Sequence, residues 1–170
     1  MATPHVDEGA PSTTRWLSAE EERAWIAVCH LMLQLPGALD GQLQRDSDLN
    51  LFEYLALSRL SMASQWTLRM SELAVLAGGS LSRLSNVIKR LEARGYVRRE
   101  PDAHDRRYTH AILTDVGWEK VVAAAPGHVH AVRTLVFEPL GADQISALAA
   151  VGDVLRGQVP IDAASSGLLD

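Results

Sequence analysis

The sequence predicts a mainly α-helical protein with a small β-hairpin, and three observations indicate this fold class. Residues 70–77 and 80–94 have the pattern of two short helices, and Gly78 and Gly79 form a turn between them. Residues 96–114 follow directly and have the pattern of two strands joined by a polar loop. The apolar content of 47% in 170 residues is typical of a globular domain rather than a disordered chain. A helix-turn-helix followed by a hairpin is the order of a winged helix-turn-helix.

The second short helix has one buried face. Ser80 is expected to be its N-cap, because a serine hydroxyl can accept a hydrogen bond from the first turn of a helix. Apolar side chains recur along the helix at the i, i+3, i+4 and i+7 spacing, which predicts a stripe that packs inward. The stripe consists of Leu84, Val87, Ile88 and Leu91.

The opposite face of this helix is polar and basic. Its hydrogen-bond donors and cations suit base edges and phosphates in a DNA major groove. A solvated helix face is the plainer interpretation, but the turn before the helix and the basic hairpin after it favour DNA contact. The candidate DNA-binding residues of this helix are Ser80, Ser82, Arg83, Ser85, Asn86, Lys89 and Arg90. Ser82 and Ser85 are also suited to capping the backbone.

The predicted wing is the loop of residues 101–108, between strands at residues 96–100 and 109–114. A short third strand is expected at residues 66–69. The loop contains a cluster of one acid and two arginines, which completes the set of candidate DNA-binding residues: Asp105, Arg106 and Arg107.

The region around this helix and hairpin resembles the MarR family of bacterial transcriptional regulators, and the resemblance covers about residues 18–158. It depends on an LExxGxVxR join between helix and hairpin, the Asp105-Arg106-Arg107 motif, and an LTDxG run that ends at Gly117. The resemblance implies that Arg107 enters the minor groove, that Asp105 orients its guanidinium, and that Arg106 lies near phosphates. Arginine suits this position because a narrow minor groove concentrates negative potential.

The resemblance also implies a homodimer in which the first helix and the last two helices of each subunit intertwine in an all-helical dimerisation region. A two-fold axis would place the two recognition helices about one DNA turn, roughly 34 Å, apart on a pseudo-palindromic operator. The implied function is a repressor of transcription, with double-stranded DNA as partner and a small-molecule effector that releases it. The alternative is a winged-helix module that uses its basic face to bind an acidic protein.

The charges are segregated along the chain, although the net charge is −5. Residues 80–110 contain eight lysines and arginines and four acids, a net charge of +4, so the remainder has a net charge of −9. A basic lobe on an acidic body would orient the protein toward a phosphate backbone.

Five segments are expected along the chain: a flexible arm at residues 1–17, a helical dimerisation segment at 18–48, the DNA-binding domain at 49–114, a second helical dimerisation segment at 115–158, and a flexible tail at 159–170. Within the first helical segment, Ser18 and Glu21 have the spacing of a capping box, and Pro36 is expected to interrupt the helix near Leu35.

Further boundaries are predicted by caps and prolines. Asn50 and Glu53 can cap the next helix, Asp115 can cap the helix after the wing, and Pro126 is expected to kink or break that helix near Ala125.

The sequence contains no motif of a phosphate loop, zinc protease or serine hydrolase, so we expect no enzyme, no cofactor and no metal. His128 and His130 are two residues apart, which places them on different sides of a helix; a zinc site that they form with His30, Cys29 and glutamates is the alternative. Cys29 is expected to be a buried thiol, with a redox sensor as the alternative. No membrane segment is predicted, and the single cysteine fits a cytoplasmic location.

Overall fold

The computed structural model describes residues 14–156 and residue 158. The chain divides into two compact units between Leu35 and Pro36, and the winged helix-turn-helix lies in the second unit. The predicted tail at residues 159–170 and most of the predicted arm at residues 1–17 lie outside the described residues.

The first helix, α1, runs over Ala19–Ser47. The Ser18 hydroxyl accepts a hydrogen bond from the Glu21 amide at 3.2 Å, and the Glu21 carboxylate accepts one from the Ser18 amide at 2.7 Å, so the predicted capping box is present. The predicted interruption at Pro36 is wrong, because Pro36 lies inside α1. A proline removes one backbone donor, and the hydrogen bonds of the neighbouring turns can keep its two sides in one helix.

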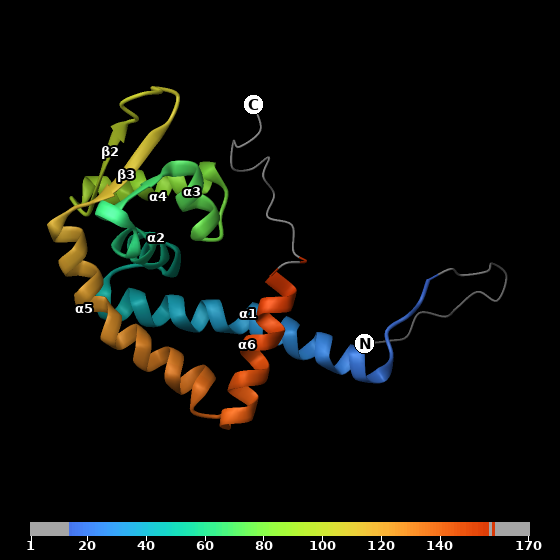
Figure 1. The fold of residues 1–170 in the computed structure, drawn as a ribbon. Coiled ribbons are helices and arrows are strands. Elements are labelled where there is room, and N and C mark those ends of the chain that lie inside the picture. The colour runs from blue at the N-terminus through green and yellow to red at the C-terminus, as the bar shows by residue number, and fades with distance from the viewer. Residues whose placement is uncertain (1–13, 157, 159–170) are drawn as a thin grey trace. The chain divides into compact units, whose positions relative to one another are not determined.

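The winged unit contains, in order, α2 (Leu51–Met62), a 3₁₀ turn η1 (Ser64–Trp66), β1 (Thr67–Arg69), α3 (Met70–Leu76), α4 (Leu81–Ala93), β2 (Val97–Pro101) and β3 (Thr109–Leu113). The strands form one antiparallel sheet in the order β1-β3-β2. In Figure 1 the hairpin of β2 and β3 extends beyond α3 and α4. The predicted fold class, mainly α with a small hairpin wing, is confirmed.

The core of the winged unit is built around α4. All four side chains of its predicted stripe are at most 4% exposed. They pack in one cluster with Leu57 and Leu60 of α2 and Leu73 of α3. Because one face of α4 is fully used by the core, its polar face must point outward.

Two glycines make the turns that position α4. Gly78, in the turn before α4, has φ +72°, and Gly95, in the turn after it, has φ +76°. Other residues avoid this left-handed region because their Cβ atom meets the backbone. Both turns are therefore sites where glycine suits the chain better than any other residue.

The wing is joined to α5 (Asp115–Val132) by a threonine cap. Thr114, not the predicted Asp115, is the N-cap of α5: its hydroxyl accepts a hydrogen bond from the Gly117 amide at 3.0 Å. The same hydroxyl donates to the Gly95 carbonyl oxygen at 2.7 Å, and the Thr114 amide donates to the Tyr96 carbonyl oxygen at 3.1 Å. Thr114 is favoured over Asp115 because only its side chain bonds both the helix and the turn.

Gly117 is required where α5 passes over the start of the hairpin. A Cβ atom at this position would overlap the carbonyl oxygen of Tyr96 and would lie 2.7 Å from Cδ1 of Leu113. We expect Gly117→Ala to lower the free energy of unfolding by about 1–3 kcal/mol, measured by denaturant titration, because the overlap forces the helix away from the sheet.

Gly37→Ala is the matched control, since a Cβ atom there meets nothing within 4 Å and alanine favours a helix. A Gly117→Ala variant as stable as the control would show that α5 and the hairpin tolerate a larger separation.

The helix α5 is continuous at the position where a kink or break was predicted. Pro126 lies inside α5. Of the kink or break predicted near Ala125, the break is therefore wrong, because the loss of one donor is again accommodated within the helix. A single π-helical turn, η2 (Arg133–Phe137), follows α5, and α6 (Ala142–Arg156) ends the described helices. Two apolar side chains of α6, Ile145 and Leu148, are 37% and 43% exposed in this single chain.

Candidate nucleic-acid interface

The polar face of α4 is set by its cap and its buried stripe. The Ser80 hydroxyl accepts a hydrogen bond from the Arg83 amide at 3.3 Å and lies 3.1 Å from the Ser82 hydroxyl. Ser82, Arg83, Asn86, Lys89 and Arg90 are exposed, and Ser85 is half-buried. The structure thus brings the candidate residues of this helix onto one face, with Ser80 bonded to the backbone.

Arg83 is held by the aromatic ring of Phe52 in α2. The guanidinium carbon lies 4.2 Å from the ring centroid, a distance at which a cation and an aromatic face attract each other. Gly79 permits this approach, because a Cβ atom there would lie 2.6 Å from two atoms of the ring. The turn before α4 therefore fixes both the helix and the direction of its first arginine.

Arg90, about two turns after Arg83 on α4, is held by a buried carboxylate. Its Nε donates to Oε1 of Glu53 at 3.1 Å, and the Glu53 side chain is only 7% exposed. Oε2 of Glu53 accepts a hydrogen bond from the Asn50 amide at 3.0 Å and lies 3.9 Å from Nη1 of Arg94. The capping box predicted at Asn50 is present, and its carboxylate also binds α4 through Arg90.

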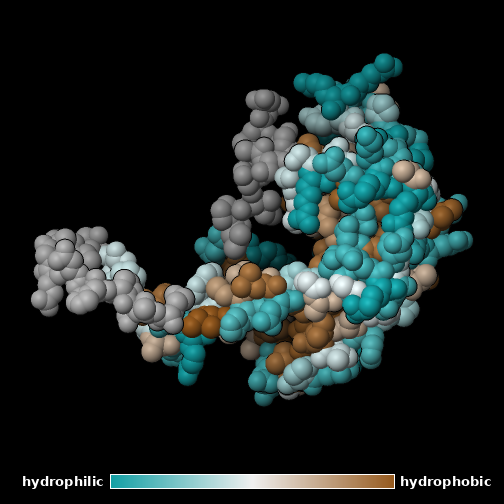
Figure 2. Space-filling model, turned by 180° about the vertical axis from the view of Figure 1, so that it is seen from behind, coloured by the Kyte–Doolittle hydropathy of each residue, from teal (hydrophilic) through white to brown (hydrophobic). Residues whose placement is uncertain are grey.

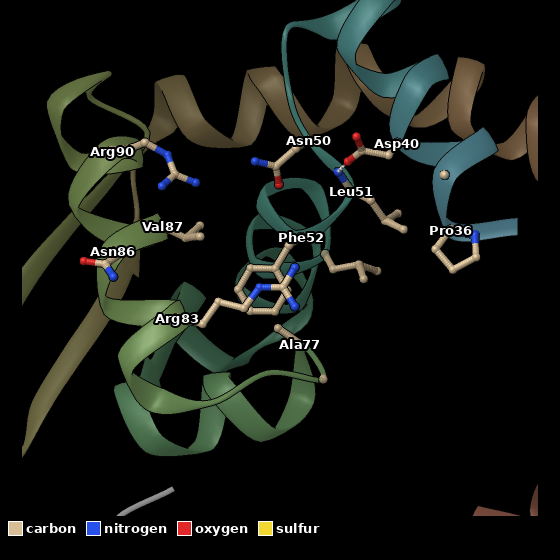
Figure 3. A pocket seen from close by; sticks show the side chains of 13 residues that line it. Pro36, Asp40, Asn50, Leu51, Phe52, Ala77, Arg83, Asn86, Val87 and Arg90 are labelled. Carbon is tan, nitrogen blue, oxygen red and sulfur yellow. Dashed lines mark hydrogen bonds between the residues drawn. The ribbon is translucent and has the colours of Figure 1, made fainter. Parts of the chain in front are cut away.

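A pocket of about 690 Å³ lies beside this face of α4 (Figure 3). Its walls come from residues 36–40 of α1, the first turns of α2, the turn before α4, and α4 itself. Figure 3 shows the Arg83 side chain against the Phe52 ring, with Asn86 and Arg90 projecting from α4. The pocket thus combines an aromatic wall with arginine side chains.

The wing arginine is clamped by a carboxylate two residues before it. Asp105 accepts hydrogen bonds from Nε and Nη2 of Arg107 at 3.0 and 2.7 Å, and from its amide at 3.1 Å. These bonds hold the pKa of Asp105 below its usual range and raise that of Arg107, so the pair is fully ionised at neutral pH. The Arg107 side chain is 81% exposed, while Arg106 beside it is also exposed.

The base of the wing is organised by Asp102. Its carboxylate lies 2.8 Å from Nε2 of His110 and accepts hydrogen bonds from the amides of His104 and Asp105, at 2.8 and 3.1 Å. The His110 bond, followed by the two amide bonds, holds the pKa of Asp102 well below its usual range. A carboxylate that accepts several such bonds is strongly favoured in its charged form.

Several other cations of the basic segment are paired within the protein. Arg99 donates to Glu92 at 2.6 Å, Arg98 pairs with Glu100, and Arg94 donates to Asp48 at 2.9 Å. The net charge of +4 for residues 80–110 already includes Glu92 and Glu100 but not Asp48, so the pairing of Arg94 lowers the positive charge of this region below that sum.

Sequence reasoning missed the residues that hold this surface from other elements. No site role was predicted for Phe52, Asp102 or Tyr108, and Arg69 was predicted only to end a strand. A cation-to-carboxylate contact across 37 residues, as between Arg90 and Glu53, leaves no periodic signal in the sequence. The sequence predicted a role for Glu53 only as part of the cap of α2, and not as a partner of Arg90.

The comparisons with known proteins bear on this surface. The model of the MarR family matches residues 47–107, which include α2, the helix-turn-helix and most of the wing. The crystal structure of Sco3205, a MarR family transcriptional regulator from Streptomyces coelicolor in complex with DNA, is similar with a TM-score of 0.82 and 40% sequence identity, over 89% of this chain and 96% of that one. This chain belongs to the MarR family.

Two further relatives are named as transcriptional regulators. The structure of AbsC, a MarR family transcriptional regulator from Streptomyces coelicolor, is similar with a TM-score of 0.75 and 36% identity, over 85% of this chain and 99% of that one. YdcH of Bacillus subtilis strain 168, an uncharacterized HTH-type transcriptional regulator, is 31% identical over 75 residues, 44% of this chain. That match spans about half, 51%, of the YdcH chain.

The described part of this MarR family chain contains neither a metal-binding cluster nor a membrane-spanning helix. No group of three or more His, Cys, Asp or Glu within it could hold a metal ion. No helix among the described residues is both long enough and apolar enough to cross a bilayer. Cys29, predicted to be buried, is half-buried. The His128 ring packs against the Tyr54 ring at a tilt of 48°, with 4.4 Å between ring centroids.

Proposed function

We propose that this protein regulates transcription, as a repressor in the bacterial cytoplasm, by binding a pseudo-palindromic operator as a homodimer. One observation carries the proposal: a helix with a buried apolar stripe presents its polar face beside an arginine-bearing wing, in a chain 40% identical to Sco3205, whose structure is in complex with DNA. A helix of this width fits the major groove, and arginine suits the adjacent minor groove.

In this proposal α4 reads the major groove through Arg83 and Asn86 and places Lys89 against a backbone phosphate, while Arg107 enters the minor groove. Arg83 and Arg107 are each held by a neighbouring side chain, at Phe52 and Asp105. Fixing a side chain before binding reduces the entropy lost when DNA binds. Asp105 accepts hydrogen bonds from both the amide and the guanidinium of Arg107, so it fixes the direction of this side chain.

The homodimer is supported by apolar side chains that one chain leaves in solvent. In residues 14–35, Trp25 is 53% exposed and Leu33 is 78% exposed. Every residue of α6 is exposed, including Val151 and Val154 at 54% and 68%. Figure 2 shows hydrophobic side chains at the surface, whereas the wing is hydrophilic. Large exposed apolar surfaces are typical of protein interfaces.

The effector part of the proposal is supported by the pocket beside α4. A ligand there would contact Arg83 and Asn86, which face DNA in this proposal, and would therefore bind DNA-free and DNA-bound protein with different affinities. To test this, small aromatic and acidic compounds are added to the complex with operator DNA, and the concentration at which each compound releases the DNA is measured.

The proposal is tested by selecting operator fragments from genomic DNA and measuring their affinity by fluorescence anisotropy at several salt concentrations. We expect a dimer by light scattering, salt-sensitive binding, and affinity for the operator at least 10³-fold above that for random DNA. A reporter gene under the selected promoter should be less active when the protein is present. A monomer that binds no fragment, but does bind an acidic protein, would support the protein-interaction alternative.

Replacing Asn86 should relax sequence preference. An asparagine can pair with two atoms of adenine, so we expect Asn86→Ala to cost about 1–3 kcal/mol per lost base contact at the operator and little on random DNA. The measurement is the ratio of the two affinities. Lys89→Ala is the control, because loss of a phosphate contact should weaken both equally. Equal weakening in the Asn86 variant would reduce Asn86 to a positioning residue.

A further inference from the structure

A second arginine, outside the recognition helix and the wing motif, is oriented toward the same surface. Arg69 is the last residue of β1 and the N-cap of α3. Its guanidinium carbon lies 4.6 Å from the centroid of the Tyr108 ring, and Nη2 lies 3.6 Å from Oδ2 of Asp102. The side chain is still 49% exposed, so it is held on one side and open on the other.

Arg69 borders a cleft of about 290 Å³, here called the wing cleft, whose lining comes from the end of β1, the first turns of α3 and α4, and the hairpin. Among the described residues that line the wing cleft are three arginines and four hydroxyl side chains, and none of them is a carboxylate. Two of the hydroxyls, Ser71 and Ser85, come from α3 and α4, and Tyr108 comes from the wing. Arginine and hydroxyl donors together suit an oxyanion.

The arginines of the wing cleft differ in how they are paired. Arg99 is bonded to Glu92 through two guanidinium nitrogens, at 3.0 and 2.6 Å, and Arg107 is clamped by Asp105. Arg69 has a longer contact with its carboxylate, and that carboxylate is already bonded to His110 and two amides. Arg69 therefore retains more of its donors for a ligand than Arg99 does.

The proposed function places a DNA strand at this cleft. If α4 lies in a major groove and the wing lies in the neighbouring minor groove, the sugar-phosphate backbone that separates the two grooves must pass between them. We propose that the wing cleft binds a backbone phosphate of the duplex and that Arg69 is its principal cation. This inference depends on the proposed function and adds a contact residue to it.

Asp102 acts on this contact through Arg69 and is a positioning residue. Its carboxylate connects β1, the wing loop and β3, because it contacts Arg69, the amides of His104 and Asp105, and His110. Substitution of Asp102 loosens the wing without removing a cation. Substitution of Arg69 removes a cation and leaves the Asp102 bonds to the loop in place.

The test is the salt dependence of DNA affinity for Arg69→Gln, with wild type, Asp102→Asn and Arg156→Gln measured in parallel. Each phosphate contact contributes about 0.9 to the slope of log affinity against log salt, so a dimer that loses two should show a slope smaller by about 1.8. The ratio of wild-type to Arg69→Gln affinity should be roughly twelvefold larger at 50 mM than at 200 mM salt. This change should be the same for operator and random DNA, because a phosphate contact does not depend on sequence. Arg156, exposed on α6 beside Asp153, controls for net charge.

The outcomes separate the inference from the function. An Arg69→Gln variant with the wild-type slope overturns the inference while the proposed function stands, whereas wild type that binds no DNA overturns the function itself. If Arg69 only supports the wing, Arg69→Gln and Asp102→Asn should weaken binding with equal slopes. Arg69→Lys keeps the charge and should restore the slope, which excludes misfolding as the cause. Inorganic phosphate that competes equally with wild type and Arg69→Gln would also contradict the assignment.

Discussion

Arg107→Ala should reduce operator affinity by roughly 10- to 100-fold, since the change removes one contact from each lobe of the dimer and the two losses multiply. The expectation depends on the geometry of the wing: the guanidinium is 81% exposed and is directed by Asp105 through two hydrogen bonds from Nε and Nη2. A cation at this position gains from the negative potential of a narrow minor groove. Fluorescence anisotropy on the selected operator measures the loss.

Two variants define what Arg107 contributes. Asp105→Asn keeps the cation but weakens its clamp, so we expect a smaller loss than with Arg107→Ala. Arg107→Lys keeps the charge but loses the planar fork, and it should recover only part of the affinity. If Arg107→Ala binds the operator as tightly as wild type, the wing does not enter the groove and the proposed binding mode is wrong.

The parts of this fold that the sequence predicts well are those that local patterns specify. The stripe of α4, the Ser80 cap and the capping boxes at Ser18 and Asn50 depend on contacts within four residues, and all are present. The hairpin is bounded within about one residue of its prediction, because strand patterns and turn residues both mark its ends.

The errors arise where a local rule competes with neighbouring turns. Pro36 and Pro126 each remove one donor, which predicts a break, but the helices on both sides continue through them. The cap of α5 was predicted at Asp115, whereas Thr114 also bonds the turn at Gly95, a contact that only the folded hairpin creates. A contact across 19 residues cannot be read from a local window.

The same limit applies to the candidate interface. Its outward-facing residues follow from helix periodicity, so sequence reasoning places them on one face of α4. The residues that hold them do not follow: Glu53 reaches Arg90 across 37 residues, and Arg69 meets Tyr108 only after the wing has folded. Counting cations in the segment likewise treats Arg99 and Arg107 as equal. Both are paired with a carboxylate, but the Arg99 side chain is 36% exposed and the Arg107 side chain is 81% exposed.

Glu53→Ala should lower the free energy of unfolding by about 2–4 kcal/mol, measured by denaturant titration. The change removes the capping bond to the Asn50 amide, worth about 1 kcal/mol, and leaves Arg90 and Arg94 without their shared carboxylate. Loss of one partner of a fully buried pair costs about 3–5 kcal/mol, and the smaller range applies here because Arg90 is 54% exposed and can reach water.

The Glu53 substitution should also change DNA recognition, because the carboxylate keeps Arg90 against α2. Glu53→Gln retains the size of the side chain and its acceptor for the Asn50 amide, but releases the charge of Arg90 toward the duplex. We therefore expect random DNA to bind more tightly while the ratio of operator to random affinity falls. Glu119→Gln, an exposed carboxylate of α5, makes the same change in net charge and should leave that ratio unchanged. An equal shift in both variants would mean that Glu53 acts through net charge alone and does not position α4.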